Sequence, residues 1–328
     1  MYIFNLSKLR AGDILLINTS ERYSAIMQKY ADSPYHHAML YVGGSSLIHS
    51  NKGPGVQADN PMRMYFEKAD AAIALRPKSS VDLPLIQAAI DQARNKVGTE
   101  YSVEEAQRTI KEKKEEEYEP NRQFCTRFVA QIYANVGLQI VENADYCTPK
   151  DLENSKYFDV IADILKDADE EELAYAMEPV TGLSKQIDIN NEILSKARAL
   201  SGLDLQTFNQ LSDYMEDHPE KDKEISVILE ESGFLEMWKW EREKNPCHYE
   251  YKSFTTTYKK SDRRVAGIQL LELAGDLEYR YSVNLLSYTK LYEQTRLRFF
   301  KLLVGLYQNL MLQVQDMKRV GNAAKNSI

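Results

Sequence analysis

The arrangement of apolar residues changes near residue 165, and this change constrains the fold more than any other feature of the sequence. Before it, short apolar runs such as Gly12–Ser20 end in turn-forming residues, which is typical of strands. After it, glycine is sparse and apolar residues recur at helical spacing, most clearly from Arg264 to Lys318, where we expect a long helix or a helical pair. The 328 residues also exceed what one ordinary core holds. We therefore expect an α+β domain over residues 1–165 and an all-α helical domain over residues 166–328.

Composition and charge exclude several classes of protein. The net charge of -8 and the pI near 5.4 give the chain no overall basic character for nucleic-acid binding. No apolar run reaches the length of about 18 residues that predicts a transmembrane helix. The N-terminus lacks the pattern of a secretory signal peptide. We expect a cytoplasmic protein that binds no nucleic acid, with leaderless secretion as the alternative.

The three cysteines, Cys125, Cys147 and Cys247, are too few and too widely spaced for a disulfide framework or a zinc site. We expect free thiols, no metal and no cofactor. Cys125 differs from the other two because it stands in the opening turns of an amphipathic helix over Asn121–Gly137, with Asn121 or a neighbour as the N-cap. A helix N-terminus favours the thiolate, so we expect a lowered pKa for Cys125. A buried structural cysteine is the alternative.

Histidine is scarce, yet His37 and His49 flank one hairpin signal, the turn sequence Gly43–Ser46 between two strand-like runs. If Tyr41 lies opposite Ser45, then His37 lies directly opposite His49. The even separation of the two histidines places both side chains on one face of the sheet. Directly opposed residues have Cβ atoms about 5 Å apart, so one imidazole can orient the other.

These residues together predict nucleophilic catalysis. His37 would take the proton of Cys125, and His49 would hold His37 in the correct tautomer. Cys125 would then attack a carbonyl to form a thioester, which water or a second acceptor resolves. A structural histidine pair or a latent metal site is the alternative interpretation.

The N-terminal half resembles the circularly permuted branch of the NlpC papain-like superfamily, which includes the YiiX-type proteins and the lecithin:retinol acyltransferase-like enzymes. The segment from His37 to His49 and the sequence FCTRFV (Phe124–Val129) carry this resemblance. It implies a permuted papain-like fold with a small antiparallel sheet packed on helices, with Cys125 as nucleophile, His37 as base and His49 as the third member. Further segments agree in order and spacing over residues 8–160: GDILL, GPGVQ (Gly53–Gln57), LRP (Leu75–Pro77), VGTEYS (Val97–Ser102) and TPKDLENS (Thr148–Ser155).

Two features depart from the family pattern. The run Ile110–Pro120 is longer and more charged than expected; such runs are usually solvated helix faces or loops, and a regulatory or partner-binding insertion is the alternative. Arg127 stands where the acyltransferase relatives have histidine, close enough to Cys125 to affect substrate contacts.

The function that these observations favour is hydrolysis or acyl transfer on an ester, thioester or amide bond of a lipid or peptide substrate. If the substrate is a lipid, a membrane surface is an expected partner. The alternatives are a leaderless secreted effector or toxin with amidase or peptidase activity, a non-catalytic binding module on the same fold, and a scaffold whose helical domain binds a protein partner.

Overall fold

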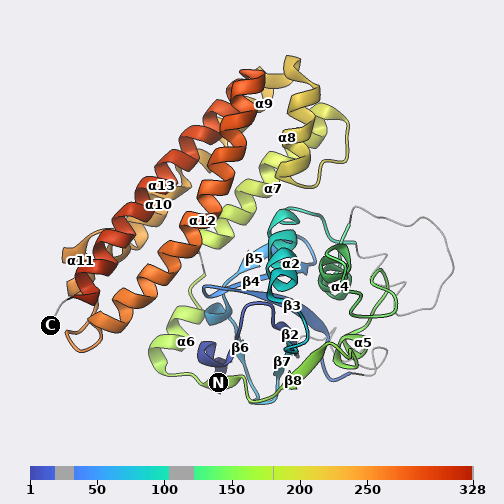
Figure 1. Cartoon of the computed structure of the whole chain (residues 1–328), viewed down its shortest axis with the longest axis vertical. Coiled ribbons are helices and arrows are strands. Elements are labelled where there is room, and N and C mark those ends of the chain that lie inside the picture. Colours follow the sequence, from blue (N-terminus) through green and yellow to red (C-terminus); the bar gives the residue numbers. More distant parts are fainter. Residues whose placement is uncertain (19–32, 103–121, 180, 327–328) are drawn as a thin grey trace. The chain divides into compact units, whose positions relative to one another are not determined.

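The chain folds into two compact units, which we describe separately. The computed structural model describes residues 1–18, 33–102, 122–179 and 181–326. The first unit comprises Met1–Leu194 and Asp204–Asn209, and the second comprises Ser195–Leu203 and Gln210–Ile328 (Figure 1). The predicted α+β class, with a small antiparallel sheet packed on helices and a helical region after it, is confirmed. The boundary at residues 165/166 stays a prediction.

The strands of the first unit form two antiparallel sheets. The larger sheet has the order β5-β4-β3-β2-β7-β8, and the smaller has the order β6-β1-β9. The strands are β1 (Tyr2–Phe4), β2 (Ile14–Ile17), β3 (His37–Gly43), β4 (Ser46–Asn51), β5 (Gly55–Asp59), β6 (Tyr65–Phe66), β7 (Ala72–Pro77), β8 (Phe158–Ile161) and β9 (Leu165–Asp167).

The described helices fall into two groups along the chain. Those before the second unit are α2 (Leu83–Asn95), α4 (Cys125–Asn135), α5 (Pro149–Glu153) and α6 (Glu170–Ala176). Those from residue 182 onward are α7 (Gly182–Ser201), α8 (Phe208–Asp217), α9 (Asp222–Glu231), α10 (Met237–Lys244), α11 (Tyr251–Thr257), α12 (Arg263–Thr295) and α13 (Arg298–Lys325), of which α7 and α8 begin in the first unit. Short 3-10 turns lie at Leu6–Lys8, Pro61–Arg63, Pro219–Lys221, Phe234–Glu236 and Pro246–His248.

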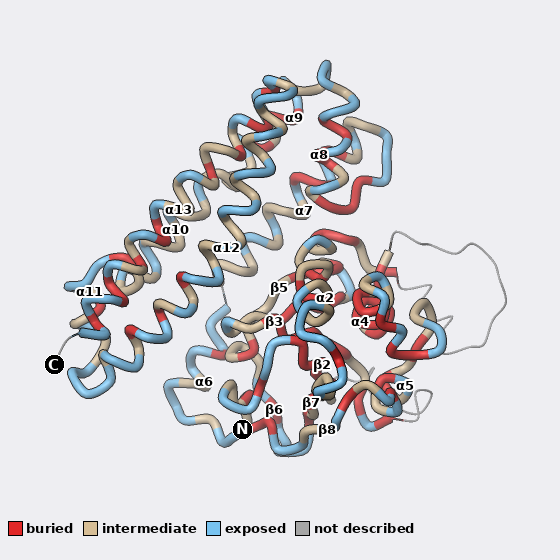
Figure 2. Tube along the Cα trace, in the orientation of Figure 1, coloured by how far each residue is buried: buried red, intermediate tan, exposed pale blue. Residues whose placement is uncertain are grey.

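The larger sheet is buried on both faces. Successive side chains of a strand point to opposite sides, so its central strands contribute to two cores. Leu16 and Leu40 lie in the core that the sheet forms with α2 and α4. Leu15 and Met39 lie in a second core, which Phe66 and other residues of the smaller sheet complete. Figure 2 shows the buried residues concentrated in the central strands and in α4. Helix α4 is thus held against one face of β3.

Two motif segments meet in a buried ion pair. Asp13, from GDILL, is completely buried, and its two carboxylate oxygens accept hydrogen bonds of 2.9 and 2.7 Å from Arg76 of LRP. The backbone N–H of Arg10 donates a further bond of 2.8 Å to the same carboxylate. A buried charge persists only where such partners surround it. These motif residues therefore stabilise the sheet between β2 and β7.

Two other motif segments lie side by side. Gly55, at the start of β5, has a φ of +77°, and a Cβ there would lie 2.1 Å from the carbonyl oxygen of Thr99. Val56 donates its N–H to that oxygen at 2.7 Å, and Gly98 donates to the carbonyl of Val56 at 2.9 Å. Only glycine permits this approach. The segment Val97–Ser102 is thereby fixed along β5.

The predicted hairpin is confirmed, but its predicted register is wrong by two residues. Tyr41 pairs with Leu47 rather than with Ser45. The turn residues Gly44 and Ser45 both have a φ of 56°, as a two-residue turn of the primed type requires, and the register shifts between Tyr41 and Gly43. Because a shift of two preserves the face, His37 and His49 still share one side of the sheet.

The predicted long helix or helical pair is a pair, α12 and α13. Arg296, in the left-handed region with a φ of 60°, ends α12. A Cβ on Gly267 would lie 2.7 Å from the Cβ of Ala324, and one on Gly321 would lie 2.7 Å from Leu271, so the two helices cross closely at these glycines. Among the described residues, no helix is both long enough and apolar enough to cross a membrane.

Candidate functional site

Cys125 is the first residue of α4 and lies against the start of β3. Its N-cap is Phe124, which makes no side-chain capping bond; the N-cap candidate Asn121 and the charge run at 110–120 lie outside the described residues. The thiol donates to the carbonyl oxygen of His36 at 4.0 Å, and the sulfur accepts from the backbone N–H of Ala38. The nucleophile candidate therefore touches the backbone on both sides of His37.

The expected lowering of the Cys125 pKa is wrong. Burial raises the pKa of this thiol above its ordinary value, although hydrogen bonds from the backbone N–H groups of Ala38, Thr126 and Cys125 itself act in the opposite direction. Desolvation penalises the thiolate more than the helix start stabilises it. In this structure Cys125 is a neutral thiol.

The two histidines are in direct contact. Nε2 of His37 lies 2.7 Å from Nδ1 of His49, and the ring planes meet at 78° with centroids 5.0 Å apart. His49 is buried, and Met39 and Leu47 beside the pair are completely buried. Burial, then the neighbouring His49 and His36, hold the pKa of His37 well below its ordinary value of 6.5. His37 is therefore neutral at pH 7 and able to accept a proton.

Asp59 is a site neighbour that the sequence analysis missed. Its Oδ2 lies 3.7 Å from Nε2 of His49, on the side of the ring away from His37. It reaches this place because β5 pairs with β4 in a register that sets Leu47 opposite Asp59 and His49 opposite Gln57. The available signal was the alternation of Gln57 and Asp59 on one face of a strand, but that strand was not predicted.

Tyr101 is a second missed neighbour. Its backbone forms a parallel bridge with Gln123, two residues before Cys125. Burial, and then the electrostatic effect of Cys125, raise the pKa of Tyr101, so its hydroxyl stays protonated near the thiol. The motif VGTEYS contained this residue, but nothing in the sequence indicated that the segment returns to the nucleophile candidate.

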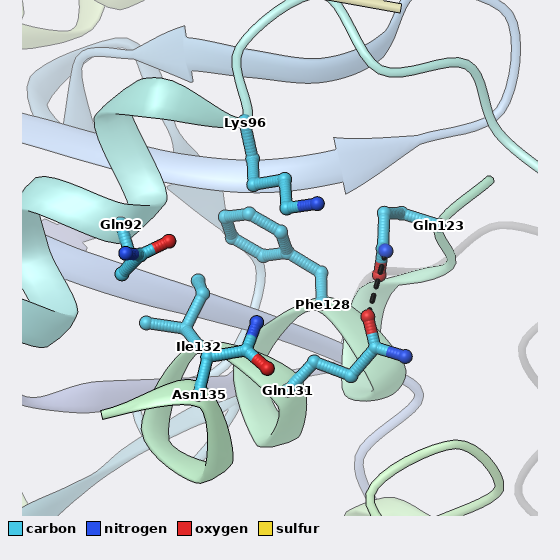
Figure 3. A pocket seen from close by; sticks show the side chains of 7 residues that line it. All are labelled: Gln92, Lys96, Gln123, Phe128, Gln131, Ile132 and Asn135. Atoms are coloured by element: carbon cyan, nitrogen blue, oxygen red, sulfur yellow. Dashed lines mark hydrogen bonds between the residues drawn. The ribbon is translucent and has the colours of Figure 1, made fainter. Parts of the chain in front are cut away.

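A chain of amide side chains fixes the segment before Cys125. The carboxylate of Asp145 accepts from Nε2 of Gln131 at 2.6 Å, and Oε1 of Gln131 accepts from Nε2 of Gln123 at 2.8 Å. Because a carboxylate only accepts hydrogen bonds, each side chain in this series donates to the next, from Gln123 through Gln131 to Asp145. Figure 3 shows these glutamines in a hollow between α2 and α4, where Lys96 extends across Phe128; the three candidate site residues do not line it.

Arg127 is a structural residue in this chain. It is completely buried; its Nη1 donates to the carbonyl of Arg122 at 3.2 Å, and its Nε donates to the carbonyl of Asp145 at 3.1 Å. Its guanidinium also lies over the rings of Phe124 and Tyr146, at 5.4 and 5.3 Å from their centroids. Arg127 thus holds the residues around Cys125 and is not exposed to a substrate.

The other cysteines lie in different surroundings. Cys147 is buried in the first core, where burial raises its pKa to about 12. Cys247 is half-buried and lies in the second unit. All three cysteines are free thiols. Across the described ranges, no three His, Cys, Asp or Glu side chains are grouped so that they could hold a metal ion.

Part of the first unit matches a known protein family. Residues 8–161 match the family described as permuted papain-like amidase enzymes, YaeF/YiiX, C92 family. The matched residues make up just under half of the chain, and over them the sequence is similar to that family. The YiiX-type resemblance stated from the motifs is thereby confirmed, and the match supports a cysteine-type hydrolase of that fold over these residues.

Among solved structures, a protein described as the metalloprotein YiiX from Escherichia coli O157:H7 is similar at a TM-score of 0.37 with 15% sequence identity. The match covers 47% of this chain and 97% of that chain. No curated protein matches the sequence.

The structure brings the sequence-predicted residues together, except for the expected contact between the thiol of Cys125 and the ring of His37. His37 and His49 are hydrogen-bonded, and Cys125 contacts the backbone beside His37. Among the hydrogen bonds of the described residues, none joins the thiol of Cys125 to the ring of His37. The arrangement places the thiol of Cys125, the neutral imidazole of His37 and the imidazole of His49 near one end of β3.

Proposed function

We propose that the first unit hydrolyses amide bonds through a thioester on Cys125, with His37 as the base and His49 as the residue that orients it. The observation that carries the proposal is the position of Cys125, at the start of α4 and against the backbone on both sides of His37. The description of the matching family as amidases supports the amide as the bond that is broken.

The ring contacts indicate which nitrogen of His37 accepts the proton of Cys125. Nε2 of His37 faces His49, so Nδ1 is the nitrogen left to accept the proton of Cys125. Both groups are neutral at rest, because burial raises the pKa of the thiol and lowers that of the imidazole. Proton transfer therefore accompanies the attack of sulfur on the carbonyl carbon, as in general-base catalysis.

The remaining steps use the same groups. The oxyanion would accept hydrogen bonds from the N–H of Cys125 at the start of α4 and from the protonated hydroxyl of Tyr101. His37 would return its proton to the leaving amine as the C–N bond breaks. A water molecule, deprotonated by His37, would then cleave the thioester, releasing the acid and regenerating the thiol. An amine or alcohol in place of water would make the same intermediate an acyl donor.

A kinetic assay with matched variants tests this function. Release of amine is measured from peptide amides and from long-chain N-acyl amides, with the corresponding esters and thioesters in parallel. We expect amide hydrolysis in the wild type and in Cys247→Ala, and none in Cys125→Ala. Equal activity of Cys125→Ala would contradict the proposal, and hydrolysis confined to esters or thioesters would refute the amide as substrate.

The same assay separates the substrate classes. Turnover of peptide amides alone supports a peptidase or amidase role, including that of an exported effector. Turnover of N-acyl amides alone supports a lipid substrate and a membrane surface as partner. Adding a primary amine and measuring the new amide distinguishes acyl transfer from hydrolysis.

A further inference from the structure

The outer nitrogen of the second imidazole indicates a fourth member of the site. Nε2 of His49 is buried and has no hydrogen-bond partner among the described residues, and the carboxylate of Asp59 lies 3.7 Å from it. We propose that Asp59 is a positioning residue, which acts through His49 to fix the proton positions of the His49–His37 pair. This inference rests on the proposed roles of Cys125 and His37.

The tautomer of each histidine decides which of its ring nitrogens can accept a proton. For His37 to accept the proton of Cys125 at Nδ1, its own proton must be on Nε2, which then donates to Nδ1 of His49 across 2.7 Å. Nδ1 of His49 must therefore be an acceptor, so the proton of His49 is on Nε2. That N–H points toward Asp59. A carboxylate there favours the one tautomer of His49 that leaves His37 able to act as a base.

The charge of Asp59 has a second effect. When His37 takes the proton, the pair becomes cationic in a buried place, where a cation is costly. The Asp59 side chain keeps 29% of its surface exposed, so it remains solvated while it faces His49, which is 2% exposed. Its negative charge stabilises the cation of the pair and not the neutral form.

The other groups around the pair do not supply this charge. Among the described residues, His37 begins β3 and His36 precedes it, Cys125 comes from α4 and Tyr101 from the segment Val97–Ser102; none of these carries a negative charge in the resting state. Gln57, directly opposite His49 on β5, has a buried Oε1 without a hydrogen-bond partner but is neutral. Gln57 is thus the alternative acceptor for the N–H of His49.

The test compares Asp59→Asn, Asp59→Glu and Gln57→Leu, with Asp159→Asn on the exposed edge strand as control. We expect Asp59→Asn to lower kcat by about 10- to 100-fold at constant KM, less than the loss of about 10⁴ seen where the carboxylate contacts the base itself. Removal of the negative charge also lowers the pKa of the pair, so the acid limb of kcat/KM should move to lower pH. Asp59→Glu should restore most of the activity. Unchanged kcat and an unchanged acid limb in Asp59→Asn would overturn the inference, as would a larger loss in Gln57→Leu than in Asp59→Asn.

A second readout does not depend on activity. Nitrogen-15 NMR of the imidazoles, in a chain with five histidines, reports the tautomer of His49. The inference requires the Nε2–H form in the wild type and a loss of its preference in Asp59→Asn, whereas the Nδ1–H form in the wild type would overturn it. If no amide is hydrolysed but the tautomer responds to Asp59, the proposed function fails and the positioning role stands.

Discussion

The two units differ in what they bury. Of the buried polar residues among those described, all but Ser212, Ser226 and Gln313 lie in the first unit, and they include the charged or titratable Asp13, His49 and Arg127. The second unit packs a core of aliphatic and aromatic side chains, with α12 and α13 in close contact at Gly267 and Gly321. The first unit therefore depends on partners for buried polar groups, and the second depends on the fit of helix surfaces.

This difference indicates where chemistry can be located. A buried polar group costs free energy unless it has a partner, so residues such as Gln123 and Arg127, which are hydrogen-bonded, hold the backbone in one arrangement. Cys125 and His37 lie at the ends of the elements that these residues fix. A helical pair held by apolar contact supplies no comparable set of oriented polar groups. The following experiments test this contrast.

The largest effect is expected from the base. His37→Ala should lower kcat/KM for an amide by about 10²–10⁴, the range for loss of a general base. The matched control is His218→Ala, because His218 lies in the second unit and is only half-buried. Equal losses in the two variants would show that the site is not confined to the first unit.

The next effect compares a fully buried ion pair with a partly exposed one. Asp13→Asn leaves Arg76 without its carboxylate and should lower the free energy of unfolding of the first unit by about 3–5 kcal/mol. The control is Asp316→Asn, which removes the partner of Arg242 at 2.7 Å; the Asp316 side chain is 20% exposed and Asp13 is fully buried. We expect a loss of at most about 1 kcal/mol there.

Separate probes follow the two units in urea. Both tryptophans, Trp238 and Trp240, lie in the second unit, so tryptophan fluorescence reports its unfolding. The reaction of the buried thiol of Cys147 with a thiol reagent reports that of the first unit. If Asp13→Asn shifts the fluorescence transition as much as the thiol transition, the two units unfold as one and the contrast between them is lost.

The helix crossing should be sensitive to shape. Gly321→Ala places a methyl group 2.7 Å from Leu271 and should lower the free energy of unfolding of the second unit by about 1–3 kcal/mol. Gly305→Ala, on the same helix, meets nothing within 4 Å and should raise it by up to about 1 kcal/mol. Tryptophan fluorescence in urea measures both. A gain in stability from both variants would contradict the close crossing.

The smallest effect is the pH dependence of stability. Because the pKa of His37 is depressed in the folded state, the unfolded chain binds the proton first as pH falls. The stability of the first unit should therefore decrease below pH 6.5, by up to about 1.4 kcal/mol per pH unit, and be unaffected above it. His37→Gln should flatten this slope in the Cys147 transition. His248, whose pKa is also lowered by burial, should affect only the fluorescence transition.

The sequence predicted those elements whose signal is local. Helices α2, α4, α12 and α13 and the β3–β4 hairpin carry clear periodicity or turn residues, so they were predicted. The smaller sheet was not, because Tyr2 of β1 pairs with Asp167 of β9 at the other end of the unit, and no local pattern marks such a pairing. The hairpin register was predicted wrongly because the prediction assumed regular pairing up to the turn. The register shifts between Tyr41 and Gly43, and the sequence does not reveal this irregularity.

The candidate site was predictable in its residue types but not in its electrostatics. The even spacing of His37 and His49 set them on one face, and this parity survived the wrong register. The pKa of Cys125 was wrong because burial by β3 is a tertiary effect that a helix start does not reveal. Asp59 was missed because its role depends on the pairing of β5 with β4.

The most direct test of the central claim is to trap the acyl-enzyme. The protein is mixed with an amide substrate that it turns over, quenched in acid, and examined by intact-protein mass spectrometry and peptide mapping. The account predicts an added acyl mass on Cys125, removable by hydroxylamine, absent in Cys125→Ala and strongly reduced in His37→Ala. An adduct on Cys147 or Cys247, or one that forms equally well in His37→Ala, would contradict it.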